Sequence, residues 1–207
     1  MRLWLLIGLL CISSLTQANG VQIGCKRLQL LLDPELSPKI LEYKWASGES
    51  VSQIPAVLEL RGCKGELLDQ LILDAPLARL DPTLLRGAST PTCLVSVDLT
   101  AAAGSYNGPL TFPVQVVNHH LQIAEAIASD GHHEPIYLAM TGKAAWKKFV
   151  TQTADDLLSV KSEPDGNGFV TFYRRYHPTR NGWLVRVKSV PVLWESDGQF
   201  PEIKFFP

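Results

Sequence analysis

The sequence predicts a mainly β protein, built as a single antiparallel sheet or a sandwich, with one amphipathic helix at about residues 142–159. Three observations favour this fold: short segments in which apolar and polar residues alternate, turn dipeptides between them, and the spacing of the prolines. All 14 prolines lie at or beyond Pro34, and the longest proline-free stretch after it is 136–163. Because proline interrupts a helix, a long helix is expected only there.

The predicted strands show a period of two residues, which is typical of a strand with one buried face. Alternation of this kind occurs in residues 41–45, 58–61 and 93–99. It continues through 112–116 and then changes phase over 117–123. The change of phase indicates either a bulge in one long strand or two short strands.

Turn dipeptides separate the segments of the second half of the chain. Asn-Gly and Asp-Gly are the dipeptides that two-residue β-hairpins prefer. Five of them favour an antiparallel meander over alternating strands and helices. They are Asn107-Gly108, Asp130-Gly131, Asp165-Gly166, Asn181-Gly182 and Asp197-Gly198.

The helix is predicted from apolar spacings of three and four inside the proline-free stretch. Thr141 precedes the pattern and suits an N-cap. Asp155 and Asp156 would then lie on the solvated side of the helix. The apolar positions are Trp146, Phe149, Val150, Thr153, Ala154 and Leu157. No repeat or low-complexity linker divides the chain, so we expect one domain over residues 19–207.

The first 18 residues have the features of a secretory signal peptide. A short positive start is followed by ten apolar residues, 3–12, and by small residues that suit cleavage after Ala18. Ten residues are too few to span a bilayer, which takes about 20. Cys11 raises the alternative of a lipid anchor, but Leu10 stands where a small residue is needed. We therefore expect a periplasmic or extracellular protein without an integral membrane segment.

Cleavage leaves Cys25, Cys63 and Cys93, which allow one disulfide and one free thiol in an oxidising compartment. Loop entropy favours none of the three pairings strongly. Cys25 shares the strand phase of Val21 and Ile23, so its side chain is expected in the core. We therefore predict a Cys63–Cys93 disulfide, with the Cys25–Cys63 and Cys25–Cys93 pairings left open.

Catalytic and metal motifs are not evident. The adjacent pairs His119-His120 and His132-His133 do not have the spacing of zinc ligands. We expect no cofactor, no metal and no enzymatic activity; the alternative is a cell-envelope hydrolase whose site is assembled from distant residues and includes a histidine. The chain carries 19 Lys and Arg against 20 Asp and Glu, a balance that excludes non-specific nucleic-acid binding.

One segment departs from this balance, because no acidic residue lies between Asp165 and Glu195. If residues 169–176 pair with 183–190, one face of the hairpin carries Arg and Lys side chains opposite each other. Like charges in that arrangement repel unless an anion or a carboxylate neutralises them. The candidate binding residues are Tyr173, Arg175, Arg186 and Lys188.

This basic and aromatic face predicts a secreted or periplasmic binding module, whose partner is an acidic protein or an anionic envelope glycan. The alternative for the same face is a solvated sheet surface, balanced by acids from the first half of the chain. The sequence does not indicate the oligomeric state.

Overall fold

A computed structural model describes residues 20–32, 41–44, 50–98, 108–196 and 199–207. They form a mainly β fold, as the sequence predicts, and their one helical element is a short 3-10 turn, η1 (Ile203–Phe205). The strands belong to several sheets, so the prediction of a single sheet is wrong. The signal segment 1–18, with Cys11, lies outside the described residues. Within them, no helix is long and apolar enough to cross a membrane.

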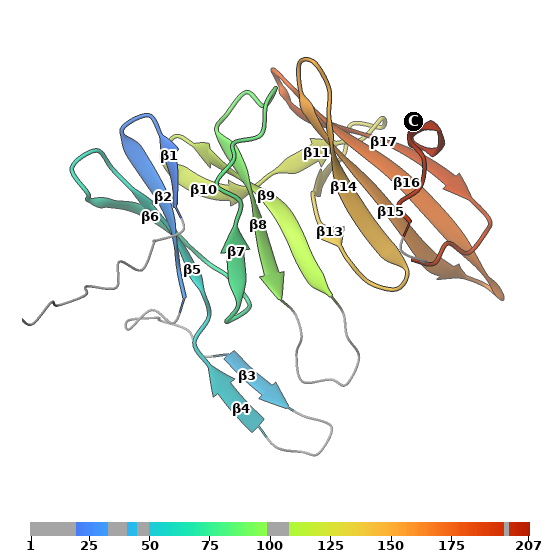
Figure 1. The fold of residues 1–207 in the computed structure, drawn as a ribbon, viewed down its shortest axis with the longest axis horizontal. Coiled ribbons are helices and arrows are strands. Elements are labelled where there is room, and N and C mark those ends of the chain that lie inside the picture. Colours follow the sequence, from blue (N-terminus) through green and yellow to red (C-terminus); the bar gives the residue numbers. More distant parts are fainter. Residues whose placement is uncertain (1–19, 33–40, 45–49, 99–107, 197–198) are drawn as a thin grey trace, which may run out of the picture.

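The first region consists of two sheets that face each other (Figure 1). Their strand orders are β1-β2-β5-β6 and β10-β9-β8-β7, with β13 also paired to β9. The strands are β1 (Gly20–Ile23), β2 (Lys26–Leu31), β5 (Val57–Arg61), β6 (Leu67–Ile72), β7 (Ala78–Leu80), β8 (Thr92–Asp98), β9 (Pro109–Val117), β10 (His120–Ile123) and β13 (Leu138–Ala139). A separate hairpin joins β3 (Leu41–Lys44) to β4 (Ser50–Gln53).

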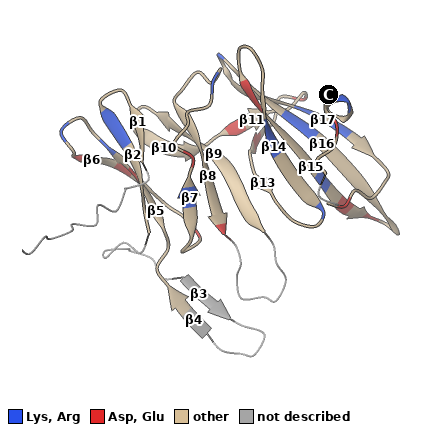
Figure 2. Cartoon of the chain, in the orientation of Figure 1, with Lys and Arg blue, Asp and Glu red and all other residues tan. Residues whose placement is uncertain are grey.

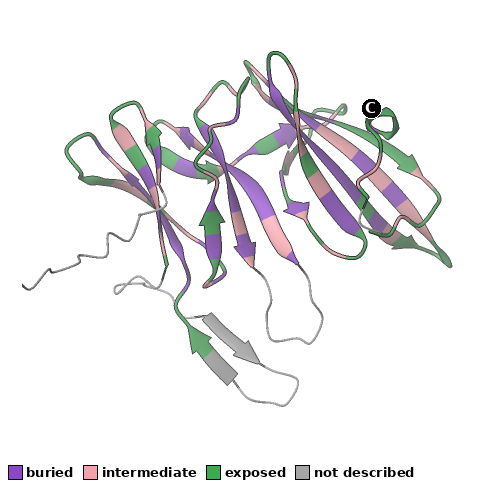
Figure 3. Cartoon of the chain, in the orientation of Figure 1, coloured by how far each residue is buried: buried purple, intermediate pink, exposed green. Residues whose placement is uncertain are grey.

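Alternating apolar residues from both sheets fill the core between them. Leu28 and Leu58 from one sheet and Val95 and Val114 from the other have at most 1% of their surface exposed. Figure 3 shows that β5 and β8 are buried over most of their length, because Glu59 and Leu94 on their other faces are covered as well. The residues that line the first core, 58 and 60 of β5 and 93, 95 and 97 of β8, follow the two-residue period predicted for 58–61 and 93–99, which is therefore confirmed over the described part of these segments.

A six-stranded sheet forms the second region, with the order β12-β11-β17-β16-β15-β14. All its neighbouring strands are antiparallel except β11 and β17, which are parallel. The strands are β11 (Glu125–Ile127), β12 (His133–Pro135), β14 (Ala144–Val150), β15 (Asp155–Asp165), β16 (Gly168–Thr179) and β17 (Gly182–Val190).

A second core joins the two regions. It contains Leu94, from the face of β8 that points away from the first core, together with Leu157, Tyr176 and Trp183 of the six-stranded sheet. Burial raises the pKa of Tyr176 to about 12. Because these residues belong to one cluster, the position of the six-stranded sheet is set by packing against the first region. The expectation of one domain over residues 19–207 stays a prediction.

The predicted helix at 142–159 is wrong, because these residues form β14, a turn and β15. At the turn, the Thr151 hydroxyl donates to the Ala154 carbonyl and accepts from the Ala154 amide. Leu157 and Leu158 are both buried, on opposite faces of β15. A strand buried on both faces loses the alternation of apolar and polar residues, and its apolar residues then match helical spacings by coincidence.

The turn dipeptides mark hairpins where the structure describes them. Asp130-Gly131, Asp165-Gly166 and Asn181-Gly182 lie at the turns between consecutive strands, whereas Asn107 and Asp197-Gly198 lie outside the described residues. The change of phase at 117–123 is a tight hairpin between β9 and β10, so the alternative of two short strands is the correct one. Both of its turn residues, Asn118 and His119, have positive φ angles.

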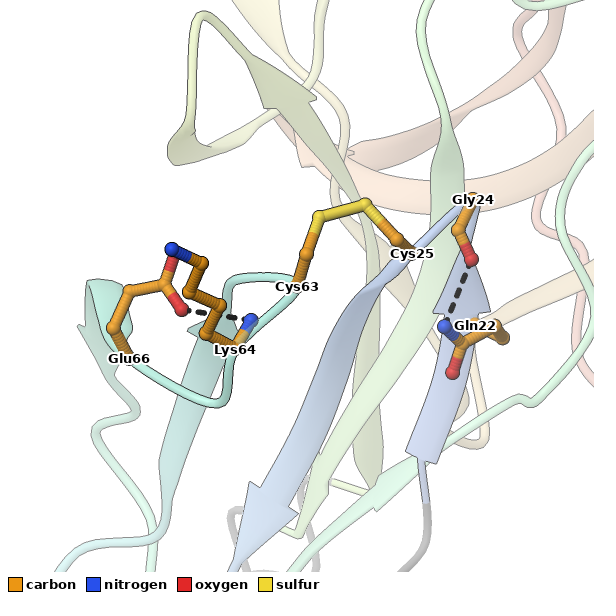
Figure 4. The surroundings of a disulfide bond; sticks show 6 residues. All are labelled: Gln22, Gly24, Cys25, Cys63, Lys64 and Glu66. Atoms are coloured by element: carbon orange, nitrogen blue, oxygen red, sulfur yellow. Dashed lines mark hydrogen bonds between the residues drawn. A yellow bond between two sulfur atoms is a disulfide. The ribbon is translucent and has the colours of Figure 1, made fainter.

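The disulfide joins Cys25 to Cys63, so the predicted Cys63–Cys93 pairing is wrong (Figure 4). Cys25 lies in the exposed turn between β1 and β2, and Cys63 lies in the turn after β5. Cys93 is a buried free thiol in the first core, and burial raises its pKa to about 12. The strand phase that suggested a core position for Cys25 ends at Ile23, where the turn begins. The bond is compatible with a location outside the cytoplasm.

A polar row crosses the first sheet on the side away from the first core, and a buried carboxylate lies at its centre. Glu59 of β5 is 4% exposed and accepts hydrogen bonds from Gln29, Gln70 and Arg61. Burial alone raises the pKa of Glu59, but these three donors outweigh burial and hold the pKa below its ordinary value.

Candidate basic binding face

The six-stranded sheet presents to solvent the face opposite the second core, which we call the outer face. Register places Lys147, Leu158, Arg175 and Arg186 in one row across β14, β15, β16 and β17. Residues directly opposite each other point to the same side of a sheet, so these four side chains share the outer face. Three of the four are cationic. Figure 2 shows Lys and Arg on several strands of this sheet.

A single buried carboxylate lies beside this row. Asp156 of β15 is 0% exposed, and its Oδ2 accepts a hydrogen bond from Nε of Arg175 at 2.7 Å and forms an ion pair with Nη2 at 2.6 Å. Its Oδ1 lies 2.7 Å from Nδ1 of His177. Both lone-pair regions of Asp156 are thus occupied, and Arg175 is held by a fixed carboxylate on its own face.

Arg186, Lys188 and Lys147 have no such partner. All three are exposed, and none forms an ion pair with a carboxylate in the part of the chain that the structure describes. Arg186 lies directly opposite Arg175, and Asp156 already uses its acceptors on Arg175 and His177. The outer face therefore has more cationic side chains than carboxylates near its β17 edge.

Tyr173 does not contribute an open ring to this face. It is 6% exposed, because the ring of Phe205 stacks on it at 5.7 Å and the ring of Phe206 meets its edge at 5.5 Å. Burial raises the pKa of the Tyr173 hydroxyl. Phe205 is 39% exposed, so it supplies the accessible aromatic surface here, and Nζ of Lys204 lies 5.6 Å from its ring centroid.

The segment after β17 positions these phenylalanines by crossing back over the strands. The Thr171 hydroxyl of β16 donates to the Val192 carbonyl, and Ser162 of β15 exchanges hydrogen bonds with the backbone of Trp194. The Ser196 amide then donates to the Gly142 carbonyl, just before β14. In Figure 1 this segment lies over the sheet near β15 and β16.

The crossing segment covers part of the outer face and leaves the rest open. Phe206 packs in a third core with Ala145, Leu158, Val160 and Tyr173. The open part carries the row through Arg175 and Arg186, together with Lys188. Two cores therefore enclose the sheet, and the cationic side chains lie beside the outer one.

Asp155, the neighbour of Asp156, binds an arginine on the opposite face. Nε and Nη2 of Arg86 donate to its Oδ1 at 3.0 and 2.8 Å, and the Arg86 amide donates to Oδ2. Burial raises the pKa of Asp155, but the hydrogen bonds from Arg86 outweigh burial and hold it below its ordinary value. Arg86 lies between β7 and β8, so this ion pair ties the first region to the hairpin of β14 and β15.

The structure brings three of the four predicted binding residues to one open surface: Arg175, Arg186 and Lys188. Lys147 and Phe205 are neighbours of this surface that the sequence does not indicate. Lys147 lies in the segment predicted as a helix, and no sequence pattern signals the return of Phe205 onto Tyr173. One sequence signal was available. Two adjacent carboxylates, Asp155 and Asp156, in a strand buried on both faces each need a cationic partner.

The alternative predicted from the sequence is a hydrolase, which needs a cleft that contains a histidine and a carboxylate. His177 does meet a buried carboxylate, Asp156, but other residues line the cavities of about 700, 640 and 230 Å³. Among the described residues, no three His, Cys, Asp or Glu side chains are grouped to hold a metal ion. The outer face is thus a sheet surface on which His177 is 46% exposed.

Comparison of the chain with models of known families, with curated proteins and with solved structures finds no match.

Proposed function

We propose that this protein is a secreted or periplasmic binding module whose outer face engages an acidic segment of a partner protein. The observation that carries the proposal is the row of Lys147, Arg175 and Arg186, which has one buried carboxylate beside it. Cross-strand pairs of like charge are destabilising by up to about 1 kcal/mol. A bound carboxylate relieves that repulsion. The relief makes the free energy of binding more favourable by about the same amount.

The spacing of the cations supports a polypeptide partner. Arg186 and Lys188 lie two residues apart on β17, a distance of about 6.6 Å along a strand. Alternate side chains of an extended acidic peptide have the same spacing, so successive acidic residues can meet successive cations. Arginine also matches a carboxylate with two parallel N–H donors, which favours such a partner over one recognised by point charge alone.

The proposal is tested by reversing the unpaired charges, Arg186→Glu with Lys188→Glu, and measuring binding to poly-L-glutamate. Arg175 is left unchanged because its loss would leave the buried Asp156 short of a partner and unfold the sheet for a different reason. We expect at least a tenfold loss of affinity, which corresponds to about 1.4 kcal/mol. Affinity of the parent protein should also fall with added salt.

The matched control reverses two exposed cations of the first region, Lys64→Glu with Arg79→Glu. It changes the net charge by the same amount and should bind poly-L-glutamate nearly as well as the parent. Equal losses in both double variants would show that net charge, not the outer face, drives binding, and would overturn the proposal. Dextran sulfate could also bind more tightly than poly-L-glutamate and lose affinity in the Arg186→Glu and Lys188→Glu double variant but not in the control. That result would assign the face to an anionic glycan instead.

A further inference from the structure

The edge of β17 that faces away from β16 is open over most of its length. β11 pairs with β17 only at Trp183 and Leu184. From Val187 to Val190, no other described strand lies on that side, and the segment after β17 turns away over β16. Val187 is 47% exposed, and its neighbours Lys188 and Ser189 are exposed as well.

The hairpin turn fixes which backbone groups point outward. Thr179 pairs with Gly182 across a two-residue loop, and the residues that flank such a loop exchange their backbone hydrogen bonds. Antiparallel pairs alternate from there, so Arg186 and Lys188 direct their N–H and C=O groups to β16. Val187 and Ser189 direct theirs to the open edge, where they are available to another strand.

Charge on this edge argues against self-association. Two β17 edges paired antiparallel would bring Arg186 and Lys188 of both copies onto one face, where like charges repel. An acidic strand has the complementary charge. Its alternate side chains would lie opposite Arg186 and Lys188 on the outer face, while the intervening ones would cover the exposed side of Val187.

We propose that the partner binds as an added strand on the β17 edge, as an extended segment with acidic residues at alternate positions. This inference rests on the proposed function and adds the backbone geometry of the complex. The backbone pairing with Val187 and Ser189 supplies part of the affinity, and the contacts with Arg186 and Lys188 set the choice of partner.

The experiment compares three peptides on the full mature chain: one alternating Glu with Val and Thr, the same peptide N-methylated at every second residue, and one of equal composition with all Glu consecutive. Affinity is measured by calorimetry and backbone protection by amide hydrogen exchange. We expect the alternating peptide to bind at least tenfold more tightly than the other two. It should protect the amides of Val187 and Ser189, while the Lys188 amide is already protected without peptide.

A protein variant gives a second, independent readout. Ser189→Pro removes an outward-facing donor and leaves the hydrogen bonds between β16 and β17 in place. It should weaken the alternating peptide severalfold and leave the consecutive-Glu peptide unchanged, with unaltered far-UV circular dichroism as the control for folding.

The outcomes separate the two proposals. Equal binding of all three peptides, lost in the Arg186→Glu and Lys188→Glu double variant, would overturn strand addition and keep the basic binding face. No binding of any peptide would overturn both. Concentration-dependent protection of Val187 and Ser189 without peptide would show a second copy on the edge and overturn the acidic partner.

Discussion

The first sheet and the six-stranded sheet differ in how they neutralise charge on their solvent sides. In the first sheet, Gln29, Gln70 and Arg61 surround one buried carboxylate, Glu59. In the six-stranded sheet, Asp156 neutralises Arg175, and Arg186 in the same row has no acidic partner among the described residues. Composition does not reveal this difference, because the chain as a whole is nearly neutral. Strand register alone does not reveal it either, because it places two arginines opposite each other in both sheets. The hydrogen bonds and ion pairs reveal it.

The largest expected effect concerns the covalent link in the first region. Replacing Cys25 and Cys63 by serine opens a loop of 38 residues, for which chain entropy predicts a loss of about 4 kcal/mol in the free energy of unfolding. Urea denaturation of the oxidised parent and of the double variant gives this difference.

The control uses Cys93, which is free in the described part of the chain. Reduction of the parent should lower its stability to that of the double variant, and reduction of the variant should change nothing, because Cys93 is free. Loss of the disulfide in a Cys93→Ser variant, detected by thiol titration of the unfolded protein, would contradict the pairing.

The next effect concerns the ion pair that ties the two regions together. Arg86→Ala leaves the carboxylate of Asp155, 5% exposed, without its guanidinium partner. Because the Arg86 side chain is 50% exposed, water reaches part of the gap that it leaves, and we expect a loss of about 2 kcal/mol in the free energy of unfolding. Lys161→Ala, which breaks an exposed pair with Glu163, should cost less than about 1 kcal/mol. Equal losses would mean that Asp155 finds another partner.

The smallest effect is the pH dependence of the polar row in the first sheet, which is centred on Glu59. The pKa of Glu59 is lowered on folding, so its contribution to stability is present above its ordinary value of 4.5 and is lost as pH falls through the folded value. Glu59→Gln should therefore be less stable than the parent at pH 7, and the difference should shrink below about pH 4.5.

Glu195→Gln, at an exposed position, is the matched control for this titration. Its unfolding free energy, measured in urea at each pH, should follow that of the parent. A difference between the parent and the Glu59→Gln variant that is constant with pH would contradict the assigned role of the carboxylate.

The sequence predicts the parts of the fold that depend on local pattern. The period of two placed Val95 and Cys93 on the buried face of β8, and the Asn181-Gly182 dipeptide placed the turn between β16 and β17. The parity of that hairpin predicts Arg175, Arg186 and Lys188 on one face, and the register confirms it. Period and turn chemistry are properties of adjacent residues, so they are readable without tertiary contacts.

The sequence fails where burial comes from elements far along the chain. β15 is covered on both faces, by the second core and by the segment that carries Phe206, so its apolar residues were interpreted as a helix. The side chain of Tyr173 was expected in solvent for the same reason. The pairing of Cys25 with Cys63 depends on two turns that meet only because β2 pairs with β5.

The crossing segment also affects the order in which the chain folds. The strands β14 to β17 pair with their neighbours in sequence, so they can associate through local contacts. Val160 and Tyr173, however, lose contact with water only after residues 192–196 and 199–206 have docked on this face. Any state in which the strands have paired and this segment has not docked exposes the apolar surface of the third core, which is the kind of surface through which partly folded chains aggregate.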